Sequence, residues 1–261
     1  RNVNYQIKLH KEWWRKFQEY TARQIDELTT RYGQIDILWL DGGQVRPDNG
    51  QDIHLDRIID KARQKQPGML AVDRTVPGRN ENYATPEMRI PSTQLNYPWE
   101  SNLQLANGWG WRKNSIYKSP QTIINNLIEI TAKGGALLLG VGPTPQGTIE
   151  EKAAICLRQV GEWLKSYGKA IYATRITPHY NDGNVWFTTS KDHKTLYALY
   201  ALPEGETLPS TITWKGNEPK GAIRLIKGNR KVKHTCKNGI ITVELPKELK
   251  NEPIAFYYNR K

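Results

Sequence analysis

The run IDILWL at residues 35–40 constrains the fold of this chain more than any other segment. It is apolar except for Asp36 and of strand length, and glycines stand on both sides of it, at Gly33 and at Gly42-Gly43. Such a run between two breaks predicts a strand buried on both faces, as in a parallel sheet covered by helices. Asp41 follows at the carboxyl end, where barrels of alternating strands and helices carry their chemistry. Asp41 is therefore either a partly desolvated catalytic carboxylate or a cap for the next turn.

Helical and strand-like patterns alternate through about residue 170. The expected helices cover residues 11–32, 53–65, 120–132 and 148–167, and the expected strands cover 35–40, 69–73 and 136–141. This alternation predicts βα units and a parallel sheet or barrel, although the strands are too few to close an eight-stranded barrel. Residues 78–98 contain three prolines and are expected to be rich in loops.

The pattern changes after residue 172. Short strand-like runs, among them VWFTT, TLYALYAL and GIITVEL, alternate with turn signals such as NDG and KNG. These features are typical of an antiparallel sandwich. The predicted fold class is therefore α/β, with a partial (β/α) TIM-type barrel over residues 1–172 and an antiparallel β-sandwich domain over 173–261.

Composition argues against several classes of protein. The net charge of +12 brings nucleic acid into consideration, but the basic residues are scattered, and the densest cluster, residues 227–237, has the alternation of a solvated strand. No apolar run approaches the roughly 20 residues that cross a bilayer. The two cysteines, Cys156 and Cys236, and the five histidines show no metal-ligand spacing. We therefore expect no nucleic-acid partner, no membrane segment and no metal site.

Charged and aromatic side chains are expected near the ends of the predicted strands. Asp73-Arg74 ends the second expected strand, Glu100 follows Trp99 after the proline-rich loop, and Trp109 lies in the run NGWGW. A pair of carboxylates beside aromatic rings suits glycoside hydrolysis, in which one attacks or activates water and the other donates a proton. Two carboxylates about 5–5.5 Å apart, here Asp41 and Glu100, would retain the configuration of the sugar.

Each of these residues also has a purely structural interpretation. Glu100 is either an acid whose pKa the neighbouring indole raises by burial, or a surface residue that follows a core tryptophan. Arg74 binds sugar hydroxyls or holds Asp41 ionised, or it forms a structural ion pair with Asp73 or Asp56. Trp109 is a stacking platform for a sugar or a core residue.

Six blocks of the sequence resemble, in order, the α-L-fucosidases of glycoside hydrolase family 29. They are YGQIDILWLDGG, AVDRTVPGRNENYATPE, YPWES, GWGW, KGGALLLGVGPTPQGTI and GEWLKSYGKAIYATR, which together cover about residues 11–175. The region between Asp73 and Glu87 is more similar to the subgroup that prefers α-1,3- and α-1,4-linked fucose. A β-sandwich after the barrel also fits that family.

The resemblance implies a retaining mechanism with a covalent fucosyl-enzyme intermediate, acting on fucosylated oligosaccharides without a cofactor. Asp41 matches the family's nucleophile, and Glu100 matches the acid/base of the subgroup. Arg74 matches an arginine that contacts fucose and steadies the nucleophile, and Trp109 matches a tryptophan near the sugar pocket. The family also implies a secreted or periplasmic location.

Two departures from the family pattern have consequences. Gly140 stands where the family's LLLN block has asparagine, which affects a local hydrogen bond. The family's early barrel strands, with a histidine pair, would precede Arg1. We therefore expect a second polypeptide that supplies these strands, or a truncated product with little activity. The alternative to an enzyme is a module or pseudoenzyme that binds fucosylated glycans without cleaving them.

Overall fold

The computed structural model describes residues 6–41, 45–74, 76 and 78–260. The chain divides between Thr85 and Pro86 into two compact units, and each is described by itself.

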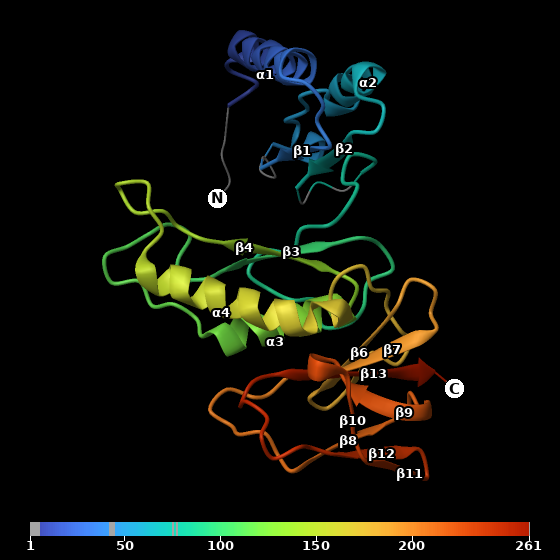
Figure 1. Ribbon diagram of the computed structural model, residues 1–261. Coiled ribbons are helices and arrows are strands. Elements are labelled where there is room, and N and C mark those ends of the chain that lie inside the picture. Colours follow the sequence, from blue (N-terminus) through green and yellow to red (C-terminus); the bar gives the residue numbers. More distant parts are fainter. Residues whose placement is uncertain (1–5, 42–44, 75, 77, 261) are drawn as a thin grey trace. The chain divides into compact units, whose positions relative to one another are not determined.

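The first unit is a short α/β module. It comprises α1 (Lys11–Arg31), β1 (Ile37–Leu40), the 3₁₀ turn η1 (Pro47–Asn49), α2 (Leu55–Lys65) and β2 (Leu70–Asp73). Strands β1 and β2 are parallel, with Ile37 opposite Leu70 and Leu40 opposite Asp73. A parallel pair needs a crossover, and α2 provides it, as Figure 1 shows. The carboxyl ends of both strands therefore lie at one edge of the pair.

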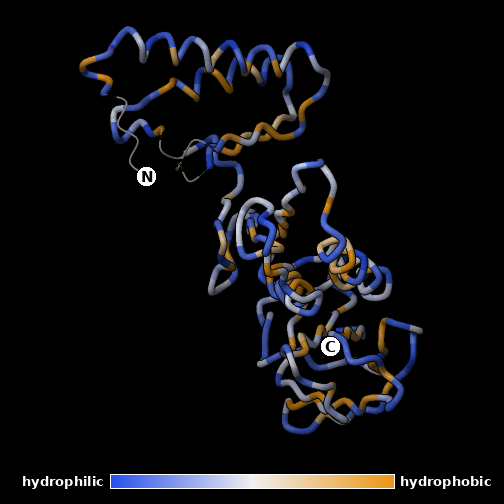
Figure 2. Tube along the Cα trace, turned by 90° about the vertical axis from the view of Figure 1, so that its left-hand side faces the viewer, coloured by the Kyte–Doolittle hydropathy of each residue, from blue (hydrophilic) through white to orange (hydrophobic). Residues whose placement is uncertain are grey.

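Alternation along the two strands decides which side packs against the helices. Leu38 and Ala71 are buried in a core with Ile25 of α1 and Ile59 of α2. Their neighbours Ile37 and Leu70, which point to the other side, are 46% and 44% exposed. Hydrophilic and hydrophobic residues alternate along the helices of this unit (Figure 2). One face of the strand pair is thus covered, and the opposite face is open within the unit.

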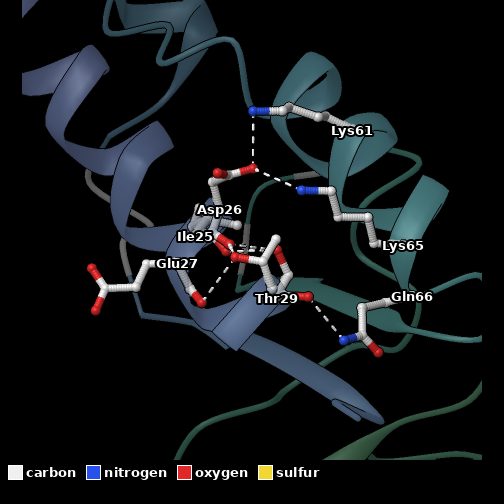
Figure 3. Close-up of polar contacts among 8 residues, drawn as sticks. Ile25, Asp26, Glu27, Thr29, Lys61, Lys65 and Gln66 are labelled. Atoms are coloured by element: carbon white, nitrogen blue, oxygen red, sulfur yellow. Dashed lines mark hydrogen bonds and ion pairs between the residues drawn. The ribbon is translucent and has the colours of Figure 1, made fainter. Parts of the chain in front are cut away.

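Polar contacts fix the two helices beside each other. Lys61 Nζ lies 2.9 Å from Asp26 Oδ1, and Lys65 approaches the same oxygen at 3.8 Å. Gln66 Nε2 donates to the carbonyl of Thr29 at 2.9 Å, near the carboxyl end of α1 (Figure 3). These contacts hold α2 along the last turns of α1, near the points where the chain enters β1 and β2.

The second unit begins with a similar arrangement. It contains β3 (Glu100–Gln104), α3 (Pro120–Ala132), β4 (Ala136–Gly140), α4 (Glu151–Tyr167) and the 3₁₀ turn η2 (Gly168–Ala170). Strands β3 and β4 are parallel, and α3 crosses between them. Ser119 caps α3 by accepting a hydrogen bond from the amide of Thr122, and Pro120 occupies the first helical position. Figure 1 shows α3 and α4 on one side of this strand pair.

The remaining residues form two antiparallel sheets. The larger has the strand order β10-β9-β13-β7-β6-β5 and the smaller the order β11-β12-β8. The strands are β5 (Asn181–Asp182), β6 (Val185–Thr189), β7 (Thr195–Tyr200), β8 (Thr211–Lys215), β9 (Pro219–Leu225), β10 (Arg230–Lys231), β11 (His234–Lys237), β12 (Ile240–Glu244) and β13 (Ile254–Arg260), with a 3₁₀ turn η3 (Lys227–Asn229) before β10.

Trp214 of β8 joins the two sheets. Its ring lies 6.2 Å from those of Phe187 and Phe256 and 6.3 Å from that of Tyr258, all on the larger sheet. Trp214 is only 1% exposed. Aromatic rings at these separations pack a sandwich core from both of its inner faces.

The structure confirms the α/β class, the antiparallel sheets and every helix expected from the sequence, with ends that shift by three residues or fewer. It adds β3, which the sequence did not predict, because ESNLQ is too polar for a buried strand pattern. The predicted boundary at 172/173 lies inside the second unit, where one apolar core contains Ile128 of α3, Val160 of α4 and Phe187 of β6. The division into two domains there stays a prediction.

Candidate active site

Asp41 and Arg74 meet at the edge where β1 and β2 end. Each is the first residue after its strand, and the parallel register brings Leu40 opposite Asp73 just before them. Arg74 Nη1 donates to Asp41 Oδ1 at 2.8 Å. The carboxylate that accepts this bond belongs to Asp41, and not to Asp73 or Asp56, the two structural partners that the sequence suggested. The parallel strand pair therefore presents a carboxylate and a guanidinium together.

Burial is distributed unequally between the two partners. The side chain of Arg74 is 9% exposed, whereas that of Asp41 is 67% exposed. The Arg74 guanidinium carbon lies 5.3 Å from the centre of the Trp39 ring, a cation–π geometry. The arginine is thus fixed between an indole and the carboxylate. The expected partial desolvation of Asp41 is not found among the described residues, where its side chain remains mostly exposed.

Asp73, the last residue of β2, lies at the same edge of the strand pair. It lines a cavity of about 240 Å³ together with Asp41, Leu40, Phe17 and other residues of the first unit. Burial raises the pKa of Asp73 to about 6, and the negative charge of Glu81 acts in the same direction. A second carboxyl group, with an affinity for protons near neutral pH, therefore stands beside the candidate nucleophile.

Glu100 is the first residue of β3, in the second unit. Trp99 before it is 3% exposed, and its indole N–H donates to the carbonyl of Lys133 at 3.3 Å. Burial raises the pKa of Glu100, as expected for a carboxyl group that follows a core tryptophan. Its position at the amino end of β3 differs from that of Asp41, which stands at the carboxyl end of its own strand.

The carboxyl ends of β3 and β4 carry a second group of polar and aromatic residues. Trp109 is 52% exposed in the loop after β3, so it is not a core residue. Trp111 Nε1 and the Tyr117 hydroxyl both donate to Glu150 Oε2, at 2.8 and 2.9 Å. These bonds attach the loop that carries Trp109 to the start of α4. An exposed indole on an anchored loop can form a stacking surface for a sugar ring.

Gly140, where the family pattern has asparagine, makes room for an amide from the neighbouring strand. A Cβ at position 140 would lie 2.2 Å from Gln104 Oε1, so a side chain there requires the Gln104 amide to move. Gln104 is 2% exposed, and its Nε2 donates to Asn102 Oδ1 at 3.3 Å. Where the family has the side-chain amide of an asparagine, this chain thus has the side-chain amide of Gln104 from β3.

Sequence reasoning did not single out Glu87 as a site residue. It forms an isolated parallel bridge with Asn102, and the amide of Met88 donates to the carbonyl of Asn102 at 2.8 Å. Residues 86–88 therefore run beside β3 like a minimal strand, with Glu87 exposed. A bridge of one residue leaves no repeating hydrophobic pattern in the sequence. The neighbouring Pro86 was the only local signal for this bridge.

Among residues 6–41, 45–74, 76 and 78–260, no cluster of three or more His, Cys, Asp or Glu side chains has a geometry for a metal ion. In the same part of the chain, no helix is both long and apolar enough to cross a membrane.

The fold and these residues define a mixed α/β protein with charged and aromatic side chains at its strand ends. The family profile described as alpha-L-fucosidase matches residues 2–169. The plasma alpha-L-fucosidase of Rattus norvegicus is 31% identical over 194 residues, which cover 69% of this chain and 42% of the rat protein. The chain belongs to the alpha-L-fucosidase family.

Two solved structures have a similar fold. Alpha-L-fucosidase isoenzyme 1 from Paenibacillus thiaminolyticus superposes with a TM-score of 0.81 and 23% identity, over 95% of this chain and 63% of that one. A family 29 alpha-L-fucosidase from Bacteroides thetaiotaomicron, trapped as a covalent intermediate with 2-fluoro-fucosyl fluoride, has a TM-score of 0.79 and 20% identity, over 100% of this chain and 64% of that one. The chain spans less than half the length of the rat protein and about two thirds of these two structures.

Proposed function

We propose that this chain is part of a retaining α-L-fucosidase that removes terminal α-linked L-fucose from oligosaccharides or glycoconjugates. The observation that carries the proposal is the contact between Asp41 and Arg74 at the carboxyl ends of two parallel strands, in a chain of the alpha-L-fucosidase family. The α-1,3 and α-1,4 linkages are the proposed substrates, from the resemblance of the region before Glu87. A secreted or periplasmic location is part of the same proposal.

Asp41 is the proposed nucleophile. Its carboxylate oxygen forms a bond to the anomeric carbon of fucose while the glycosidic C–O bond breaks, and the departing oxygen takes a proton from the acid/base residue. Water then gives a proton to that same residue and attacks the anomeric carbon, which releases Asp41 and fucose. The trapped covalent intermediate of the Bacteroides relative supports this sequence of steps. Arg74 orients Asp41 for the attack, and Trp109 is the proposed surface for the sugar.

Glu100 is the proposed acid/base, because burial raises its pKa toward the range in which a carboxyl group can donate a proton. Its place at the amino end of β3 argues for a test against another carboxyl group. Glu87 is the second candidate, because it stands on the segment that runs parallel to β3, opposite Asn102.

Paired variants separate the two assignments. Glu100→Gln and Glu87→Gln are assayed with aryl α-L-fucosides of good and poor leaving groups, with and without azide. Loss of the acid damages poor leaving groups most, and azide restores turnover of activated substrates. If only the Glu87 variant behaves in this way, the assignment of Glu100 is wrong.

The barrel itself is part of the proposal. Each unit has a strand pair with helices on one side, and the other side leaves Ile37, Leu70 and Leu138 between 40% and 46% exposed. Apolar strand faces of this kind are normally covered in a closed barrel. We therefore propose that residues 1–172 form the later part of a (β/α) barrel, that 173–261 form the sandwich domain, and that a further polypeptide segment completes the barrel.

A chromogenic α-L-fucoside assay tests the function as a whole. The 261-residue chain and the longest natural polypeptide that contains it are compared, and the mass of each purified species is measured. Turnover by the longer polypeptide supports the enzyme. Binding of fucosylated glycans without turnover by either species would replace the enzyme with a non-catalytic glycan-binding protein.

A further inference from the structure

The edge of the six-stranded sheet carries a row of like charges in register. Lys231 on the edge strand β10 stands opposite Arg224 on β9, and Arg224 stands opposite Tyr257 on β13. The buried neighbours Ile223 and Leu225 point to the sandwich core, so the row lies on the outer face of the sheet. Like charges directly opposite each other in a sheet are destabilising.

The rest of the same outer face is covered. Tyr257 pairs with Tyr197 on β7, which pairs with Thr188 on β6, and the Thr188 hydroxyl donates to the carbonyl of Ala170 in η2 at 2.8 Å. Tyr197 and Thr188 are buried. The cover formed by η2 therefore ends near Tyr257, and beyond it the sheet is open as far as β10.

A third cation stands where the cover ends. Lys169 of η2 places its Nζ 5.2 Å from the centre of the Tyr257 ring. Lys169 and Lys231 are exposed, and Arg224 is partly buried. Lys169 and Arg224 thus flank Tyr257, and Lys231 stands beside Arg224, so these four residues form a basic shelf at the edge of the sheet.

The surrounding structure orients these cations without neutralising them. Arg224 Nη1 donates to the carbonyl of Asn229 at 2.9 Å, and the side chain of Asn229 accepts a bond from the Tyr257 hydroxyl. Nearby Arg230 pairs with Glu248, and Lys227 pairs with Glu252. Over the described residues, no ion pair joins a carboxylate to Lys169, Arg224 or Lys231.

We propose that this shelf, defined as Lys169, Arg224, Lys231 and Tyr257, binds a sulfate group of an acidic polysaccharide. A guanidinium and an ammonium side by side suit an oxyanion, because the planar fork of arginine donates two parallel bonds and the lysine adds a point charge. An anion between Lys231 and Arg224 also removes the repulsion that the free sheet carries. This site is separate in the chain from Asp41, and it does not depend on the proposed hydrolysis.

The geometry favours a sulfated glycan over single-stranded nucleic acid. Proteins that bind single strands stack bases on open aromatic faces. Here the Tyr257 ring has Lys169 over it, and its hydroxyl is bonded to Asn229. The shelf therefore offers charge without a free stacking surface.

Binding of a defined dextran sulfate oligosaccharide to the 261-residue chain tests the proposal, with unsulfated dextran of equal length as the reference. The double variant Arg224→Gln/Lys231→Gln is expected to bind at least tenfold more weakly. The matched control Lys237→Gln/Lys247→Gln removes the same charge from β11 and from the loop after β12, and it is expected to change affinity less than twofold. Binding should weaken with salt, with a shallower salt dependence in the shelf variant.

Three results would overturn the site. They are equal losses in the two double variants, binding of the unsulfated dextran as tight as that of the sulfated one, and no binding of either by the unmodified chain. A single-stranded oligonucleotide of equal charge that binds more tightly, and is lost with the same shelf variant, would replace the glycan with nucleic acid.

A single variant tests the like-charge step independently of binding. Lys231→Gln should leave the melting temperature of the free chain unchanged or raise it, because it removes a repulsion. It should still weaken the binding of the sulfated oligosaccharide. A melting temperature lower by several degrees would show that Lys231 stabilises the sheet, and the argument from repulsion would then be wrong. Arg224→Lys, which keeps the charge but loses the fork, should give an intermediate affinity.

Discussion

The first unit and the antiparallel sheets cover their apolar surfaces to different extents. In the sheets, Trp214, Phe187 and Phe256 are at most 1% exposed, in an apolar core that also contains residues of α3 and α4. In the first unit, Ile37 and Leu70 remain nearly half exposed beside the carboxylate and arginine at the strand ends. The sandwich thus has the features of a stabilising element. The parallel strands end in Asp41 and Arg74, beside a face that is open within the first unit.

The largest expected effect concerns the reactive half of this comparison. Asp41→Ala in the longest active polypeptide should lower kcat by about 10⁴-fold or more, because no covalent intermediate can form. Its melting temperature is measured alongside, because the variant removes the carboxylate that Arg74, a 9% exposed arginine, contacts. Steady-state kinetics on an aryl α-L-fucoside measure the loss. Asp60→Ala, which removes another exposed carboxylate of the same unit, should keep turnover within twofold, and an equal loss in both would refute the role of Asp41.

The sequence predicted that Asp41 and Arg74 follow the ends of two strands because the signal for each strand is local. A short apolar strand followed by Asp41, and a second followed by Asp73-Arg74, are enough to place the two side chains at one edge once the strands are parallel. The partner of Arg74 could not be chosen among Asp41, Asp73 and Asp56 from the sequence. That choice depends on the register of β1 against β2, which is a tertiary property.

Other parts of the site and fold left weaker signals in the sequence. Strand β3 was not predicted because one of its two faces, with Glu100, Asn102 and Gln104, is polar, so hydrophobic alternation is missing. The bridge at Glu87 involves one residue and has no period at all. The Gln104 side chain fills the space beside Gly140, which lies 36 positions later in the chain. No local pattern in the sequence predicts such a contact.

The second expected effect concerns the closed half. Trp214→Ala should reduce the free energy of unfolding by about 3–5 kcal/mol, because it leaves a large cavity between the two sheets. Urea unfolding of the 261-residue chain measures this. Trp214→Phe, which keeps an aromatic ring at the centre, should cost less than the alanine variant. A cost below 1 kcal/mol for Trp214→Ala would mean that the sandwich core does not hold the sheets together.

A substitution on the open face of the first unit allows the same stability measurement. Ile37→Ser should change the stability of the 261-residue chain by less than about 0.5 kcal/mol, because nearly half of the residue is already exposed to water. In a longer polypeptide that completes the barrel, the same change should cost about 1–3 kcal/mol, since the side chain would then be buried. Equal effects in both polypeptides would contradict the proposal that further strands cover this face.

A third, smaller effect tests how the reactive group is held. Arg74→Lys keeps the positive charge but loses the planar fork that lies between Trp39 and Asp41. We expect kcat/KM to fall by about 10²-fold, because the nucleophile is no longer fixed in the direction of attack. Arg79→Lys, an exposed arginine paired with Asp60, is the matched control and should have little effect. Similar kinetics for the two variants would remove Arg74 from the site.

The smallest expected effect is a pH dependence of the stability of the first unit, which comes from Asp73. Burial raises the pKa of Asp73 to about 6, with Glu81 adding to the rise and Arg46 opposing it. The ordinary aspartate value is about 3.9, so between about pH 4 and pH 6 the folded state binds more protons than the unfolded state. The contribution of Asp73 to stability is therefore fully present below about pH 4 and is lost as the pH rises through 6.

Asp73→Asn isolates this contribution. Asparagine cannot ionise, so the variant should lack the loss between pH 4 and pH 6, and at pH 7 it should be more stable than the parent by about 1 kcal/mol, a value already reduced for solvent screening of a half-buried group. Urea unfolding at pH 4, 5 and 7 gives the difference between variant and parent at each pH. A difference that does not change with pH would mean that Asp73 titrates near its ordinary value. In that case water reaches the Asp73 carboxyl group in the cavity beside Asp41 more freely than its burial in the structure implies.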